Sequence, residues 1–134
     1  MKAANLDQLV APISFDPESV SRKHIEQIIS HLEIVVFKPE EEIVKQYDQS
    51  HDMYFIQYGT AYVKYRDRLG REKLLGRKLE VGYHFGHIAL FYNTRRSATV
   101  VSGDFSTMGR LSKQGYETLV EKMPEFAAVM EKIC

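Results

Sequence analysis

The chain has only one cysteine among its 134 residues, and that cysteine, Cys134, is the last residue. No disulfide can form within the chain, so a reducing compartment is the simpler expectation. The sequence also lacks an N-terminal signal peptide and has no apolar run long enough to cross a bilayer. We therefore expect a cytoplasmic protein that does not insert into a membrane by itself.

An excess of charge of either sign is missing too, because 18 Lys and Arg side chains balance 18 Asp and Glu side chains. Proteins that mainly bind nucleic acids have basic surfaces, so this balance argues against a nucleic-acid partner. Basic residues do cluster between Arg66 and Lys78, but Asp67 and Glu72 interrupt the cluster. We expect that segment to be a solvated β-hairpin rather than a patch for an anionic partner.

The length predicts a single domain, and the spacing of apolar residues along the chain divides it into three parts. These parts are a helical N-terminus over about residues 1–32, a β-rich part over about 33–111, and helices over about 112–134. Asp16 and Pro17 predict a helix start, and Ser112 predicts another. The short strands between them, with Gly59 at a tight turn, favour a roll or barrel.

Residues 85–101, FGHIALFYNTRRSATVV, are the stretch most suited to binding a ligand. Gly86 lets the backbone approach a ligand without hindrance from a Cβ atom. The apolar residues 88–91 can form a short helical turn, whose first N–H groups have no internal partner and attract negative charge. Arg96 comes just before an alternating β-rich run, where its planar guanidinium can clamp two oxygens of one phosphate.

The same stretch resembles the phosphate-binding cassette of the cyclic nucleotide-binding domain family. FGHIAL followed by RRSATV is similar to the family's usual cassette, and MYFIQYG at 53–59 and LEVGYHFG at 79–86 resemble its upstream strands and turns. The resemblance covers roughly residues 33–122 with several motifs in the right order. It implies a mainly β fold with flanking α-helices, a jelly-roll-like double-stranded β-helix or β-roll.

The resemblance also implies a site and a function. The ligand would be cAMP or cGMP, with no cofactor, and selectivity between the two stays open. The domain would be regulatory rather than enzymatic, passing a conformational change to the remainder of a larger polypeptide, for instance a cation channel that assembles as a homo-oligomer. The residues that would contact the ligand are Gly86, His87, Ile88, Ala89, Arg96, Ser97 and Ala98.

His87 is the one departure from the family's pattern, because the family has a glutamate there that accepts a hydrogen bond from the ribose 2′-hydroxyl. The imidazole is either a weak substitute for that acceptor, a partner for phosphate once protonated, or the mark of a site that has lost its ligand. The last possibility leads to an alternative function, a degenerate domain that serves as a protein interaction or assembly module.

Other classes of protein have weaker support in the sequence. His84 and His87 are compatible with a cupin-like metal enzyme, but no third ligand is spaced for them, so we expect no metal site. No catalytic constellation is visible by spacing, and no DNA-reading helix pair follows the β-rich part. The helix that commonly closes over the base in the family is expected to be missing or truncated, which would fit a piece of a longer protein.

Overall fold

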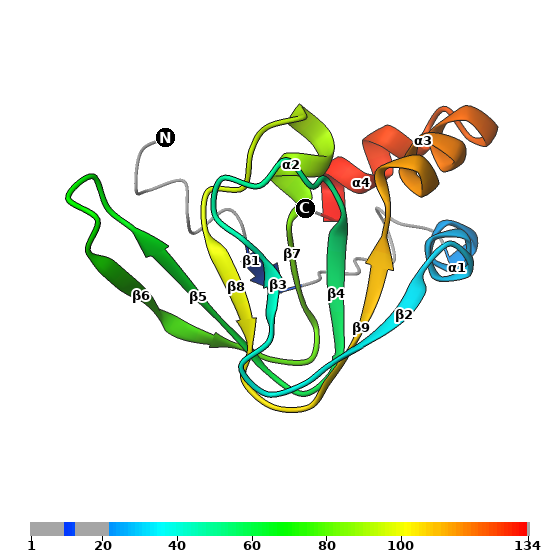
Figure 1. The fold of residues 1–134 in the computed structure, drawn as a ribbon. Coiled ribbons are helices and arrows are strands. Elements are labelled where there is room, and N and C mark those ends of the chain that lie inside the picture. Colours follow the sequence, from blue (N-terminus) through cyan, green and yellow to red (C-terminus); the bar gives the residue numbers. More distant parts are fainter. Residues whose placement is uncertain (1–9, 13–21, 134) are drawn as a thin grey trace.

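The computed structural model describes residues 10–12 and 22–133 of the chain and contains two antiparallel sheets. The five-stranded sheet has the order β1 (Val10–Pro12), β7 (Tyr83–Phe85), β4 (Met53–Tyr58), β9 (Ser106–Leu111) and β2 (Glu33–Phe37). The four-stranded sheet has the order β3 (Glu42–Val44), β8 (Thr99–Ser102), β5 (Ala61–Arg66) and β6 (Glu72–Leu79). In Figure 1 the strands of the two sheets curve around each other as a roll.

The core of the roll lies between the two sheets, because both contribute alternate side chains to it. Along β5, Ala61 and Val63 are buried while Tyr62 and Lys64 are more exposed. On the other sheet, Tyr54 and Phe85 stack with ring centroids 5.2 Å apart and belong to the same core. The period of two in the sequence therefore set which face of each strand is inside.

Gly59 makes the tight turn between β4 and β5 with a φ of 91°. A Cβ atom built at this position would approach the carbonyl oxygen of Phe105 to 2.7 Å, so glycine is required both by the backbone conformation and by the space. The sequence prediction of a positive φ at Gly59 is confirmed.

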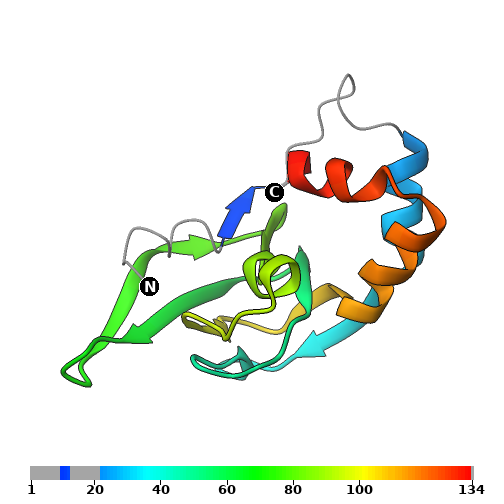
Figure 2. The ribbon, with the colours of Figure 1, turned by 90° about the horizontal axis from the view of Figure 1, so that it is seen from above.

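Three helices cover one end of the five-stranded sheet, on its side away from the roll (Figures 1 and 2). They are α1 (Arg22–Ser30), α3 (Lys113–Lys122) and α4 (Phe126–Ile133). Their apolar faces form a second buried cluster with the sheet and with the short helix α2 (His87–Tyr92); its members include Ile28, Met53, Phe55, Leu90, Leu119, Phe126 and Met130. Within the described ranges, no helix is both long and apolar enough to cross a membrane.

The predicted helical N-terminus is only partly tested. Residues 22–30 are helical, whereas the proposed helix start at Asp16 and Pro17 lies outside the described residues. The prediction is wrong at Val10–Pro12, which form β1 and pair with β7 at the edge of the five-stranded sheet. Edge pairing depends on a partner some seventy residues away, which no local period reveals.

The basic segment between Arg66 and Lys78 is a hairpin, as predicted, formed by β5 and β6. Its charges are partly paired along the hairpin: Arg71 lies 3.0 Å from Asp67, and Lys64 lies 3.3 Å from Glu72. Pairs at this degree of exposure contribute little stability but reduce the local positive potential. Acidic side chains thus lie beside basic ones along this hairpin.

Ser112 caps α3, because its hydroxyl oxygen accepts a hydrogen bond of 2.9 Å from the backbone N–H of Gly115. Ser112→Ala is expected to lower the free energy of unfolding by about 1 kcal/mol, since the N–H of Gly115 in the first turn of α3 would lose its acceptor. Urea denaturation measures this loss. Gln114→Ala, at an exposed position of the same helix, is the control; equal stabilities for both variants would contradict the capping role.

Candidate functional site

The candidate site is the cassette between β7 and β8, which contains α2 and the two arginines. Gly86 begins it with a φ of 88°, at the N-cap of α2. A Cβ atom there would lie 2.7 Å from both Arg96 Nη1 and the carbonyl oxygen of Asp52. Glycine is therefore needed because the backbone is left-handed and because the guanidinium of Arg96 lies directly against it.

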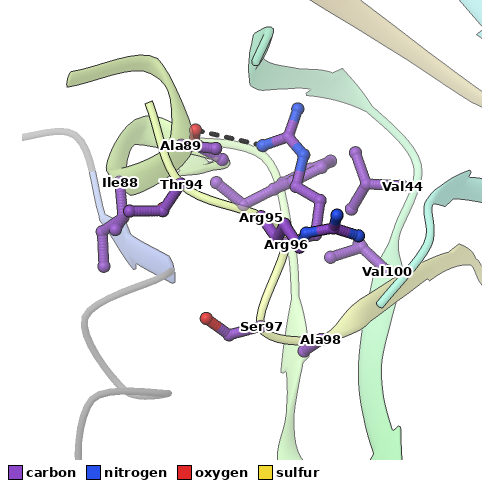
Figure 3. A pocket seen from close by; sticks show the side chains of 11 residues that line it. Val44, Ile88, Ala89, Thr94, Arg95, Arg96, Ser97, Ala98 and Val100 are labelled. Atoms are coloured by element: carbon purple, nitrogen blue, oxygen red, sulfur yellow. Dashed lines mark hydrogen bonds between the residues drawn. The ribbon is translucent and has the colours of Figure 1, made fainter. Parts of the chain in front are cut away.

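A small cavity of about 20 Å³ lies within this cassette, between α2, the loop that follows it and the start of β8 (Figure 3). Its lining residues are Val44, Phe85, Gly86, Ile88, Ala89, Thr94, Arg95, Arg96, Ser97, Ala98 and Val100. Six of the seven residues predicted from the sequence are among them, all except His87. Tertiary folding thus brings together the two halves of the cassette that the sequence separates by a helix.

Arg96 is almost fully buried, with 5% of its surface exposed, and its guanidinium group is held by three acceptors. Nη1 donates to the carbonyl oxygen of Gly86 at 3.1 Å, the bond drawn in Figure 3, and Nη2 donates to that of Asp52 at 2.6 Å. Nε donates to the hydroxyl of Ser50 at 3.1 Å. Three of its five N–H groups are therefore engaged, and the head group has one fixed orientation.

The charge of Arg96 is not neutralised by a contact ion pair, since no carboxylate of the described residues lies within salt-bridge distance. Burial lowers the pKa of Arg96, and the nearby charges of Tyr54, Asp52 and Asp48 act against this effect. A buried cation without a partner anion is costly. The site therefore has an electrostatic preference for an anionic ligand.

The loop between β3 and β4 fixes the backbone on the other side of Arg96. The backbone N–H of its residue Tyr47 donates to the carbonyl oxygen of Arg96 at 2.8 Å. The backbone carbonyl oxygen of Asp48 accepts from the N–H of Arg96, also at 2.8 Å. Tyr47 reaches this position with a φ of 75°, unusual for a residue with a side chain. Arg95 is exposed and donates to the carbonyl oxygen of Tyr47 at 3.2 Å, so only Arg96 is built into the site.

His87, the seventh predicted ligand contact, does not line the cavity in the ligand-free structure. Its ring is buried and packs edge-on against His84, with ring centroids 5.2 Å apart, and against Phe91 at 6.1 Å. The ring thus lies between His84 of β7 and Phe91 of its own helix, α2, and no local sequence pattern predicted these contacts.

Sequence reasoning missed several residues of the site. Val44 lines the cavity because β3 pairs with β8, which places it opposite Val100. Ser50 and Asp52 hold the guanidinium from a loop more than forty residues before Arg96. None of them carries a local motif. The other additional lining residues lie within residues 85–101, the stretch singled out from the sequence; they are Phe85, Thr94, Arg95 and Val100.

Two observations bear on other kinds of site. Within residues 10–12 and 22–133, no three His, Cys, Asp or Glu side chains gather in a group that could hold a metal ion.

A larger open groove of about 470 Å³ runs along β5 and β6, with Glu40, Asp104 and Lys78 in its lining. Its mixed charges show no preference for an anion, in contrast to the cassette.

The fold is a two-sheet β-roll whose cavity combines a glycine-started short helix with a buried arginine, which defines a candidate anion-binding site. The family model described as "Cyclic nucleotide-binding domain" matches residues 34–123, and the chain belongs to this family. The recognition of the family from the cassette motif is confirmed.

Curated relatives include two kinds of regulated protein. The potassium/sodium hyperpolarization-activated cyclic nucleotide-gated channel 2 of Mus musculus is 27% identical over 106 residues, which are 79% of this chain and 12% of the channel. A cAMP-dependent protein kinase regulatory subunit of Mucor circinelloides f. lusitanicus is 32% identical over 111 residues, covering 79% of this chain and 26% of that subunit. This chain therefore spans about an eighth to a quarter of the length of these relatives.

Solved structures confirm the predicted fold. The catabolite activator protein of Thermus thermophilus aligns with a TM-score of 0.76 at 20% identity, over 87% of this chain and 54% of that chain. The regulatory domain of Toxoplasma gondii PKA, solved with cAMP, aligns with a TM-score of 0.73 at 18% identity, over 87% and 43%. The mainly β roll with flanking helices is thus the fold of this chain.

Proposed function

We propose that this chain binds a cyclic nucleotide, cAMP or cGMP, in the cassette cavity. The observation that carries the proposal is the buried guanidinium of Arg96, which lies at the cavity and is paired to no carboxylate among residues 10–12 and 22–133. A cyclic phosphate is a singly charged anion with two free oxygens, which suits the remaining N–H groups of this guanidinium. Membership of the family and likeness to a domain solved with cAMP support the same ligand.

Other parts of the cavity lining offer further hydrogen-bonding groups and space to such a ligand. The first N–H groups of α2 have no partner inside the helix and follow Gly86, so they face the same region as the arginine. The hydroxyl of Ser97 stands apart from the guanidinium of Arg96 in Figure 3 and offers a second hydrogen-bonding group. Ala89 and Ala98 are small and leave room beside these donors.

The small size of the cavity favours the alternative function, a domain that does not bind a nucleotide. About 20 Å³ is far below the roughly 300 Å³ at which ligand sites usually begin, so the cassette must open to admit a nucleotide. Together with the His87 ring packed away from the cavity, this supports the second candidate, a degenerate domain that acts as an interaction or assembly module. The electrostatic cost of leaving Arg96 unpaired makes us prefer the first candidate.

Ligand binding would be transmitted through α2, because its two sides touch different parts of the molecule. Ile88 and Ala89 line the cavity, whereas Leu90 belongs to the buried cluster with α3 and α4. Phe91 lies against Tyr116 of α3, with ring centroids 5.6 Å apart. A cassette fixed by phosphate would therefore shift the C-terminal helices. The extent of this shift depends on how much more tightly the ligand binds the shifted arrangement than the ligand-free one.

The wider setting of the domain is part of the same proposal. We infer one cyclic nucleotide-binding domain within a larger cytoplasmic polypeptide, such as a cation channel or a kinase regulatory subunit, with no enzymatic activity of its own. The parent protein would provide any homo-oligomer.

Isothermal titration of the purified domain with cAMP and cGMP tests the proposal. We expect saturable heat with at least one nucleotide, and none with adenosine, which has no phosphate to engage Arg96. The absence of heat with either nucleotide at millimolar concentration would reject nucleotide binding and favour the interaction module.

A further inference from the structure

The hydroxyl of Thr94 is an exception among the buried hydroxyl groups of the described residues. Its Oγ1 atom is buried and has no hydrogen-bond partner, and it is the only hydroxyl of the described residues in this condition. Other buried hydroxyls are satisfied: Thr99 Oγ1 accepts from the N–H of Gln46 at 3.0 Å, and Ser102 donates to Ser106 at 3.0 Å. An unsatisfied buried hydroxyl destabilises a folded protein, so its position needs an explanation.

Thr94 lines the cassette cavity together with Arg96 and Ser97 (Figure 3). Both of its neighbours are anchored. Asn93 ends α2 with a φ of 55° and accepts a hydrogen bond from Lys113 at 2.7 Å, and Arg95 donates to the carbonyl oxygen of Tyr47. The segment therefore holds the Thr94 side chain at the cavity rather than letting it turn out to water.

We propose that Thr94 is a ligand-binding residue whose hydroxyl donates a hydrogen bond to the nucleotide in the opened cassette, and that the free domain is less stable because this hydroxyl has no partner. This inference rests on the proposed function. It differs from the role of Arg96 in kind, because the arginine supplies charge whereas the threonine supplies a single neutral donor. It makes the cassette a site in which stability is lost so that ligand affinity is gained.

Thr94→Val tests the inference because valine has nearly the same shape and lacks the hydroxyl. In the ligand-free protein we expect a higher melting temperature, since a buried unsatisfied group is replaced by an apolar one. In calorimetry we expect an affinity for cAMP or cGMP weaker by about three- to tenfold, the usual effect of losing one neutral hydrogen bond. Thr94→Ser, which keeps the hydroxyl, should retain the wild-type affinity within about twofold.

Matched controls separate this result from a general effect of removing a hydroxyl. Thr99→Val removes a buried hydroxyl that has a partner and leaves the N–H of Gln46 without its acceptor, so its melting temperature should fall. Thr118→Val on α3 lies away from the cassette and should leave affinity unchanged.

Each outcome decides a different claim. A lower melting temperature for Thr94→Val would mean that the hydroxyl has a partner in the free domain, and would overturn the inference. Unchanged nucleotide affinity in this variant, with a wild type that binds, would overturn the inference and leave the proposed function standing. A wild type that binds neither nucleotide would overturn both.

Discussion

Arg96→Ala is expected to weaken binding of cAMP or cGMP by about 2–5 kcal/mol, roughly thirty- to several-thousandfold in the dissociation constant. The size follows from burial: the guanidinium is 5% exposed, so its charge acts on an anionic ligand with little screening by water. Removing it also leaves the carbonyl oxygens of Gly86 and Asp52 without their donor. Isothermal titration measures the loss, and circular dichroism checks that the variant is folded.

Two further variants make this result specific. Arg95→Ala removes an exposed arginine whose side chain donates to the carbonyl oxygen of Tyr47, and should change affinity by less than about threefold. Arg96→Lys keeps the charge but lacks the planar guanidinium fork that reaches the three separate acceptors, so an intermediate affinity is expected. Equal losses at Arg95 and Arg96 would show that net charge, and not the built site, attracts the ligand.

Phe126→Ala is expected to lower the free energy of unfolding by about 3–5 kcal/mol, a large part of the roughly 5–15 kcal/mol available to a domain. Phe126 is fully buried in the helical cluster, where it joins Met53, Leu119 and Met130. Truncation would leave a cavity between α4 and the five-stranded sheet. Guanidinium denaturation at equilibrium gives the change in free energy.

Phe105→Ala is the matched control, because that phenylalanine is 64% exposed and its truncation should cost less than about 0.5 kcal/mol. A second measurement connects the cluster to the site. Met53 follows Asp52, whose carbonyl oxygen holds Arg96, so loosening the cluster should also lower nucleotide affinity. Wild-type stability in Phe126→Ala would mean that α4 does not contribute to the core of this domain.

Much of the fold was predictable because its signals are local. The alternation along β5, the turn at Gly59 and the cap at Ser112 each depend on a few adjacent residues, and each is found in the structure as expected. The N-terminal region was predicted less well, since β1 exists only through its pairing with β7. A three-residue strand has no period of its own that a sequence pattern can reveal.

For the site, the sequence by itself determined the order of glycine, short helix and arginine, and therefore the family and six of the seven predicted residues that line the cavity. Only the tertiary structure decided how Arg96 is held, where the His87 ring packs, and that the Thr94 hydroxyl has no partner. The physical reason is distance along the chain. A backbone conformation is chosen by neighbouring residues, whereas the direction and the partners of a buried side chain are chosen by segments that meet only after folding.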